Sequence, residues 1–95
     1  MTQPKVITKS ISAQNIFSDS LVVLNSPFNL SLSGTWVAIV HLQRSFDDGA
    51  TWLDMEKFNI NVERVGTEPE VGTLYRFGVK TGNYTSGTII GRLSW

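Results

Sequence analysis

The sequence predicts an all-β fold: one small antiparallel β-sandwich or barrel, of the jelly-roll or immunoglobulin-like kind, with about eight strands. Apolar and polar residues alternate over short segments, most strictly from Phe28 to Ser33, as expected for a strand with one buried face. Turn-forming residues separate these segments at short intervals, and no helical periodicity is sustained along the chain.

The first third of the chain supplies the strands that precede a central hairpin. β-Branched residues over 6–12 indicate an edge strand, and Ile16 and Phe17 are expected to anchor a loop over the core. The apolar run 21–24 suits a strand covered on both faces. Gly34 is expected to turn the chain out of the alternating segment and into the hairpin.

The central hairpin is predicted over residues 35–52, as a long strand, a tight turn and the start of a second strand. Asp47, Asp48 and Gly49 form the turn, because Asp accepts local backbone hydrogen bonds and Gly adopts positive φ without a steric clash. Alternation predicts a core-facing row made of Trp36, Ala38, Val40, Leu42 and Phe46. The opposite, polar face carries His41, Gln43 and Ser45.

Residues 45–52 also have the form Ser-x-Asp-x-Gly-x-Thr-Trp, which resembles the Asp-box of sialidase-type propeller blades. The resemblance implies a self-satisfied hairpin, in which Asp47 accepts the amides of the turn and Trp52 packs beneath it. The motif occurs once in a chain too short for a propeller. It therefore predicts a structural role for Asp47, Asp48, Gly49 and Trp52 and not sialidase activity.

Four further segments complete the predicted domain. They are 53–58, 60–65, 74–80 and 88–95, with a loop over 66–72. With 95 residues the chain forms one domain, predicted over residues 6–95, and residues 1–5 are expected to be a flexible arm.

Eight basic and eight acidic side chains cancel, which argues against nucleic-acid binding through a broad basic surface. The carboxylates of the second half lie between Asp54 and Glu70, whereas every charged residue beyond Glu70 is basic. Two interpretations remain open: these segments pair across a sheet, or they form complementary patches on neighbouring subunits.

The composition supplies few parts for catalysis, so we expect a non-enzymatic protein with no cofactor or metal site. His41 is the single histidine, expected at the surface or at an interface, and there is no cysteine for a disulfide, a nucleophile or a zinc site. The carboxylates at the hairpin are assigned to turn chemistry. No apolar run reaches the roughly 20 residues of a membrane span, and the first residues do not resemble a signal peptide.

Apolar or aromatic residues at exposed-looking positions suggest a candidate interface made of Val37, Ile39, His41 and Trp95. The first interpretation for the aliphatic members and Trp95 is that they belong to the core, because sandwich strands can be covered on both sides; the interface is the alternative. A carbohydrate-binding module is a second possibility, because aromatic faces stack on sugars; the candidates are Trp36, Trp52, Tyr75, Tyr84 and Trp95.

The segments 28–35, 42–52, 74–76 and 84–88 together resemble a family of small proteins encoded in tailed-bacteriophage genomes, with similar order and spacing over residues 20–94. Members of that family resemble virion components, and their genes lie among head and tail morphogenesis genes. The resemblance implies a structural protein of the virion, assembled in the host cytoplasm, whose partners are the major capsid protein or other virion proteins. Head decoration (cement) by a homo-oligomer is the first expectation, and a head–tail or tail component is the alternative.

Overall fold

The computed structural model describes residues 5–24 and 27–95, which form two packed antiparallel sheets, so the prediction of an all-β fold is confirmed. This part of the chain contains nine strands, where about eight are expected from the turn spacing. The strands are β1 (Val6–Ile11), β2 (Ile16–Phe17), β3 (Leu21–Val23), β4 (Phe28–Ala38), β5 (Val40–Ser45), β6 (Leu53–Phe58), β7 (Val62–Gly66), β8 (Thr73–Val79) and β9 (Tyr84–Ser94). The additional strand is the two-residue β2, in the segment expected to be a loop.

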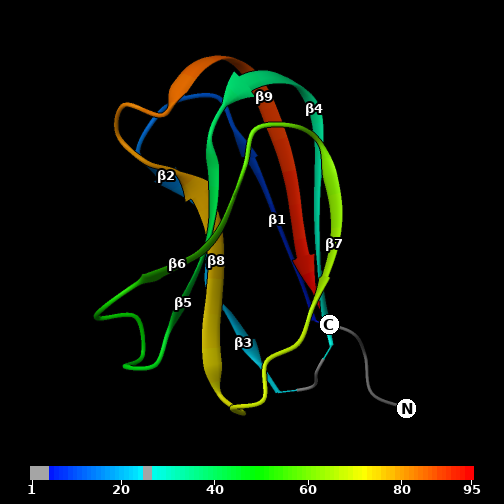
Figure 1. Cartoon of the computed structure of the whole chain (residues 1–95), viewed down its shortest axis with the longest axis vertical. Coiled ribbons are helices and arrows are strands. Elements are labelled where there is room, and N and C mark those ends of the chain that lie inside the picture. The colour runs from blue at the N-terminus through cyan, green and yellow to red at the C-terminus, as the bar shows by residue number, and fades with distance from the viewer. Residues whose placement is uncertain (1–4, 25–26) are drawn as a thin grey trace.

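The two sheets lie face to face (Figure 1). The first, sheet A, has the order β1-β9-β4-β7, and the second, sheet B, has the order β2-β8-β5-β6 with β3 also paired to β8. Hairpin β5–β6 extends away from the sandwich on the side of sheet B (Figure 1).

The core lies between the sheets and is built from the inward rows that alternation predicts. Phe28, Leu30 and Leu32 of β4 are all buried, and the ring of Phe28 lies 4.4 Å from the ring of Tyr75 on β8. Ala38, Val40 and Leu42 are buried as expected, whereas Trp36 is only half-buried. The prediction that Phe46 belongs to this row is wrong: its side chain is 51% exposed, because the strand ends at Ser45 and the turn directs the ring away from the core.

The predicted long strand over 35–45 is wrong, because two strands occupy it. Gly34 does not turn the chain: β4 runs through Gly34, which pairs with Ile89. Its φ is +99°, and a Cβ there would lie 2.4 Å from the carbonyl oxygen of Thr88, so the glycine permits the close approach of β9. The chain passes from sheet A to sheet B at Ile39, which separates β4 from β5.

The expected N-terminal arm falls mostly on residues 1–4, which lie outside the described residues. Lys5, its last residue, exchanges two backbone hydrogen bonds with Trp95, with N···O distances of 2.9 and 3.0 Å. The ladder between β1 and β9 therefore continues one pair beyond Val6.

Pairing between the acidic and basic segments is present at one position of sheet B. Asp54 on β6 and Lys80, directly after β8, lie on either side of β5 with 2.6 Å between Oδ2 and Nζ. Glu56 instead pairs with Arg64, which joins the open edges of the two sheets. The loop carboxylate Glu68 is buried, and its Oε1 accepts from the Arg44 guanidinium at 2.9 Å.

Candidate functional site on the outer face of sheet B

The turn between β5 and β6 has the internal hydrogen bonding that the Asp-box pattern implies. Asp47 Oδ1 accepts from the Ser45 hydroxyl at 2.7 Å and from the Thr51 amide at 2.8 Å. The Gly49 amide donates to Ser45 Oγ at 2.9 Å. These bonds hold the pKa of Asp47 below its usual value, with the bond from Ser45 as the largest cause.

Backbone conformation at the turn agrees with the prediction for Gly49, whose φ is +93°, and Asp48 also has positive φ at 60°. Trp52 closes the turn, and a Cβ on Gly49 would lie 3.7 Å from the Trp52 ring. The internal hydrogen bonding expected for the hairpin is therefore present. The indole of Trp52, however, covers the outer face of sheet B, where it meets Arg76.

The polar row of β5 is buried, which the sequence did not indicate. His41, Gln43 and Ser45 are 9%, 4% and 1% exposed, although they face away from the core between the sheets. The expectation of a surface position for His41 is therefore wrong. Its physical reason is a second layer of side chains, supplied by β2, β8 and the residue before β6, which covers this face.

The centre of that layer is Arg76 of β8. Its guanidinium carbon lies 4.1 Å from the centroid of the Phe17 ring and 4.3 Å from that of the Trp52 ring. Phe17 comes from β2 and Trp52 directly precedes β6, and these strands lie on opposite sides of β8, so the rings approach the guanidinium from two sides. We call Phe17, Arg76 and Trp52 the arginine stack.

Gly78 makes room for the stack. It is the outward residue that follows Arg76 on β8, and a Cβ there would lie 2.3 Å from the Phe17 ring and 2.4 Å from the Ile16 carbonyl oxygen. Any side chain at this position would displace β2. The glycine therefore allows the Phe17 ring to lie directly over Gly78, whose cross-strand partner is His41.

A hydrogen-bonded chain of polar groups continues from the stack across the sheet. Arg76 Nε donates to Gln43 Oε1 at 2.8 Å, and Gln43 Nε2 donates to Asp54 Oδ1 at 2.9 Å. Lys80 Nζ donates to the other oxygen of Asp54 at 2.6 Å. The Lys80 ammonium and the Gln43 amide hold the pKa of Asp54 below its usual value, so this carboxylate stays ionised.

His41 lies beside this chain and is kept neutral near pH 7. Burial lowers its pKa, and the Lys80 charge lowers it further, with Asp54 opposing them. Its Nδ1 has no hydrogen-bond partner among the described residues. Burial also lowers the pKa of Arg76, although arginine stays charged at any ordinary pH.

The four residues of the candidate interface do not meet on one surface. Val37 is 58% exposed on the outer side of sheet A, whereas Ile39 is half-buried at the crossover. Trp95 is half-buried against the core and its indole N–H donates to the Val22 carbonyl at 2.7 Å. The β4–β9 register pairs Val37 with Ser86, nine residues before Trp95, so Val37 and Trp95 lie at opposite ends of sheet A, about 31 Å apart at about 3.4 Å per residue.

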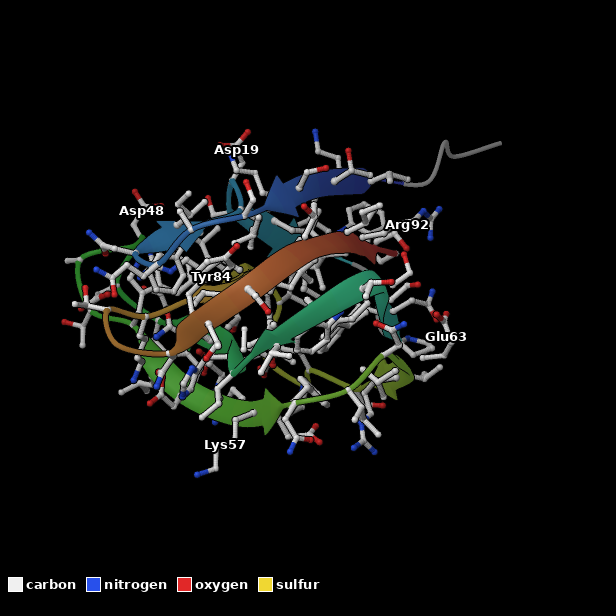
Figure 2. The ribbon with its side chains drawn as sticks, turned by 90° about the horizontal axis from the view of Figure 1, so that it is seen from above. Asp19, Asp48, Lys57, Glu63, Tyr84 and Arg92 are labelled. Carbon is white, nitrogen blue, oxygen red and sulfur yellow. The ribbon has the colours of Figure 1, made fainter. Side chains whose placement is uncertain are left out.

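The outer face of sheet A is lined by small hydroxyl and aliphatic side chains. The apolar and polar alternation of β4 predicts these side chains for β4 itself but not for the neighbouring strands. The register of the sheet aligns outward hydroxyl side chains from three strands, Thr8, Ser10, Ser31, Ser33, Thr35, Ser86 and Thr88. Exposed aliphatic side chains lie among them or at the margin, Val6, Val37, Val65 and Ile90. We call this surface the hydroxyl face. Figure 2 shows its charged members Arg92 and Glu63 on the side of the molecule opposite Asp48.

Comparisons with known proteins add no relative: no family model, curated protein or solved structure matches this chain. Over residues 5–24 and 27–95, no group of three or more His, Cys, Asp or Glu side chains is placed to hold a metal ion. The same residues contain no helix of the length and apolarity needed to cross a bilayer.

Proposed function

We propose that the chain is a non-enzymatic structural protein of a tailed-bacteriophage virion, and that it decorates the assembled head by docking its hydroxyl face on the capsid. The proposal combines the sequence resemblance with one structural observation, the hydroxyl face itself. That surface crosses the four strands of sheet A and consists mostly of small hydroxyl and aliphatic side chains.

Such a face suits a docking role because covering it costs little free energy. Short Ser, Thr and Val side chains lose little rotamer freedom, and hydroxyl groups can exchange water for partner hydrogen bonds. Its charged side chains already have partners: Glu63 accepts from the Ser31 hydroxyl at 2.6 Å, and Arg92 donates to Ser94 Oγ at 2.9 Å. A protein that binds the assembled lattice and not its free subunits stabilises the shell by mass action.

The test uses purified protein and phage heads assembled without it. Co-sedimentation should show saturable binding at fixed sites on heads, and electron microscopy of the decorated particles should place the density over the head surface. Binding confined to tails or connectors would favour the head–tail alternative. A protein that ignores every particle under all ionic conditions would contradict the proposal.

A matched pair of variants locates the contact. Ile90→Glu introduces a charge in the middle of the hydroxyl face, whereas Ile60→Glu makes the same change in the loop between β6 and β7. Both isoleucines are exposed, by 50% and 69%, so both variants should fold. Ile90→Glu should weaken head binding about tenfold or more and Ile60→Glu should leave it unchanged. Equal loss in both would place the contact elsewhere.

One specific observation supports a second candidate function, saccharide binding. A hollow of about 280 Å³ is lined by Gly34, Thr35, Trp36, Asn59, Ile60 and Asn61. Asn61 fixes the Trp36 indole by accepting its N–H at 2.7 Å, and itself donates to the Gly34 carbonyl at 3.0 Å. A glycan array would decide this alternative: binding lost in Trp36→Ala and kept in Trp52→Ala would support it, and an array without a binder would remove it.

A further inference from the structure

Arg76 is held in one orientation before any ligand arrives. Aromatic rings cover its guanidinium from two sides, at 4.1 and 4.3 Å from the ring centroids, and Gln43 takes its Nε–H. Gln43 is itself 4% exposed and fixed by Asp54, so this support is rigid. The donors left for a ligand are therefore the Nη groups, along the edge of a side chain that remains partly exposed.

Among the described residues Arg76 has no acidic partner, which distinguishes it from Arg44 and Arg64 but not from Arg92 on the other sheet. Arg44 and Arg64 have carboxylate oxygens at 2.9 and 2.6 Å, whereas no carboxylate of a described residue lies within 4 Å of Arg76. Asp54 is the carboxylate joined to Arg76 through Gln43, and it is already bonded to Lys80. A partly desolvated cation is thus left without a direct counter-charge, which costs free energy that a ligand could recover.

We propose that the Nη edge of Arg76 is a binding site for a carboxylate group, supplied by an acidic side chain of a partner protein. A guanidinium edge and a carboxylate form two parallel N–H···O bonds, and rings on the faces of the cation strengthen the site by excluding water. Lys80 and Lys57 lie on the same face and add positive charge around it.

The same surroundings favour carboxylate over phosphate. With two rings at 4.1 and 4.3 Å from the guanidinium carbon and Nε–H bonded to Gln43, the Nη edge is the part of the cation left for a ligand, and this edge matches a planar carboxylate lying in the guanidinium plane. The ionised Asp54 nearby repels a phosphate dianion more strongly than a singly charged carboxylate. The inference does not depend on the proposed function, because it concerns the opposite face of the sandwich and a small chemical group.

The test is a titration of the full chain, without any virion component, with a hexaglutamate peptide capped at both ends. Two-dimensional ¹H–¹⁵N spectra follow the Arg76 Nε–H and the Trp52 indole N–H. Both signals should shift and saturate. Inorganic phosphate at matched ionic strength should bind more weakly, and tighter binding of phosphate would overturn the assignment to carboxylates.

Three variants separate the site from general charge attraction. Arg76→Gln should weaken peptide binding about tenfold or more, because the bidentate contact is lost. Arg76→Lys keeps the positive charge but loses the paired donors, so it should bind the peptide more weakly than the parent and more tightly than Arg76→Gln. This second variant keeps the test valid if Arg76→Gln folds poorly. Arg92→Gln removes an arginine from the hydroxyl face and should bind as the parent does. Equal affinity in Arg76→Gln, equal loss in Arg92→Gln, or no saturable shift in the parent would each overturn the proposal.

Discussion

The two sheets of the sandwich differ most on the faces that they turn away from the core. The outer face of sheet A leaves its row of small hydroxyl side chains exposed, whereas on sheet B the polar row His41, Gln43 and Ser45 is buried. Alternation of apolar and polar residues is the same in both, so composition alone does not explain the difference. What differs is a covering layer, the arginine stack, whose members come from β2, from β8 and from the residue directly before β6.

This comparison shows that a polar row in a β-strand has two possible fates. It faces water when nothing in the chain can reach it, and it becomes a buried hydrogen-bond network when aromatic and cationic side chains lie over it. Sheet B can carry this second layer because Gly78 leaves space for Phe17 and because the turn between β5 and β6 brings Trp52 back over the sheet.

The largest effect is expected from filling the space beneath Phe17. Gly78→Val would put a Cβ within 2.4 Å of both the Phe17 ring and the Ile16 carbonyl, so β2 must detach. We expect a loss of about 3–5 kcal/mol in the free energy of unfolding, measured by urea denaturation. Ser33→Val introduces the same side chain at an exposed position of the hydroxyl face that already bears a Cβ, and should alter stability by about 0.5 kcal/mol or less. Similar losses in both variants would show that the faces do not differ.

Removing one ring of the stack should have the next largest effect. Trp52→Ala uncovers Arg76 and the buried row of β5, and we expect a loss of about 2–3 kcal/mol, below the cost of truncating a fully buried tryptophan. His41 should then become more solvated, so its pKa should rise towards the ordinary value in an NMR titration. An unchanged His41 titration would mean that Trp52 does not cover this row.

Gly49→Val tests the turn that delivers Trp52 to the stack. A β-branched residue is strained at a φ of +93°, and we expect a loss of about 1–2 kcal/mol. Differential scanning calorimetry against the parent measures it. Equal melting temperatures would show that the turn tolerates a different backbone conformation.

The smallest effects are expected from titration of Tyr75 and Glu68, a hydrogen-bonded buried pair that holds the 66–72 loop on the core side of sheet B. The Tyr75 hydroxyl donates to Glu68 Oε1 at 2.6 Å, and burial, followed by this bond, raises the pKa of Tyr75 to about 12. Because the folded state holds this proton more tightly, Tyr75 contributes stability below its unfolded pKa of about 10, and that contribution is lost as the pH rises towards 12. An ultraviolet difference titration of tyrosinate in the parent and in Tyr75→Phe measures this pKa, and full ionisation of the parent's tyrosines by pH 11 would contradict it.

Glu68 should give the acid counterpart of this behaviour. Burial opposes its ionisation, but bonds from Tyr75, Arg44 and the Glu70 amide outweigh it and lower the pKa of the carboxyl. A group with a lowered pKa stabilises the fold above its unfolded value, and this contribution disappears as the pH falls through the folded value. Urea denaturation from pH 7 to pH 3 should therefore show a smaller decline in Glu68→Gln than in the parent. Parallel declines would mean that Glu68 does not carry the acid sensitivity.

Much of the fold was determined by the sequence alone, because alternation and turn chemistry act over a few residues. The inward row Phe28, Leu30 and Leu32 and the hydrogen bonding of Asp47 and Gly49 follow from neighbours close along the chain. The turn predicted at Gly34 is wrong because a glycine in the sequence is compatible with either a turn or a close approach of two strands. Only the carbonyl of Thr88, more than fifty residues away, distinguishes the two.

The candidate site was decided by tertiary structure. Phe17, Arg76 and Trp52 lie far apart in the sequence, and each has an ordinary local explanation as a loop anchor, a surface cation or a turn residue. They meet because β2 and the hairpin pack on opposite sides of β8, and that pairing depends on contacts that no local pattern records. Local periodicity thus determines which way a side chain points, whereas the order of strands in the sheet determines what covers it.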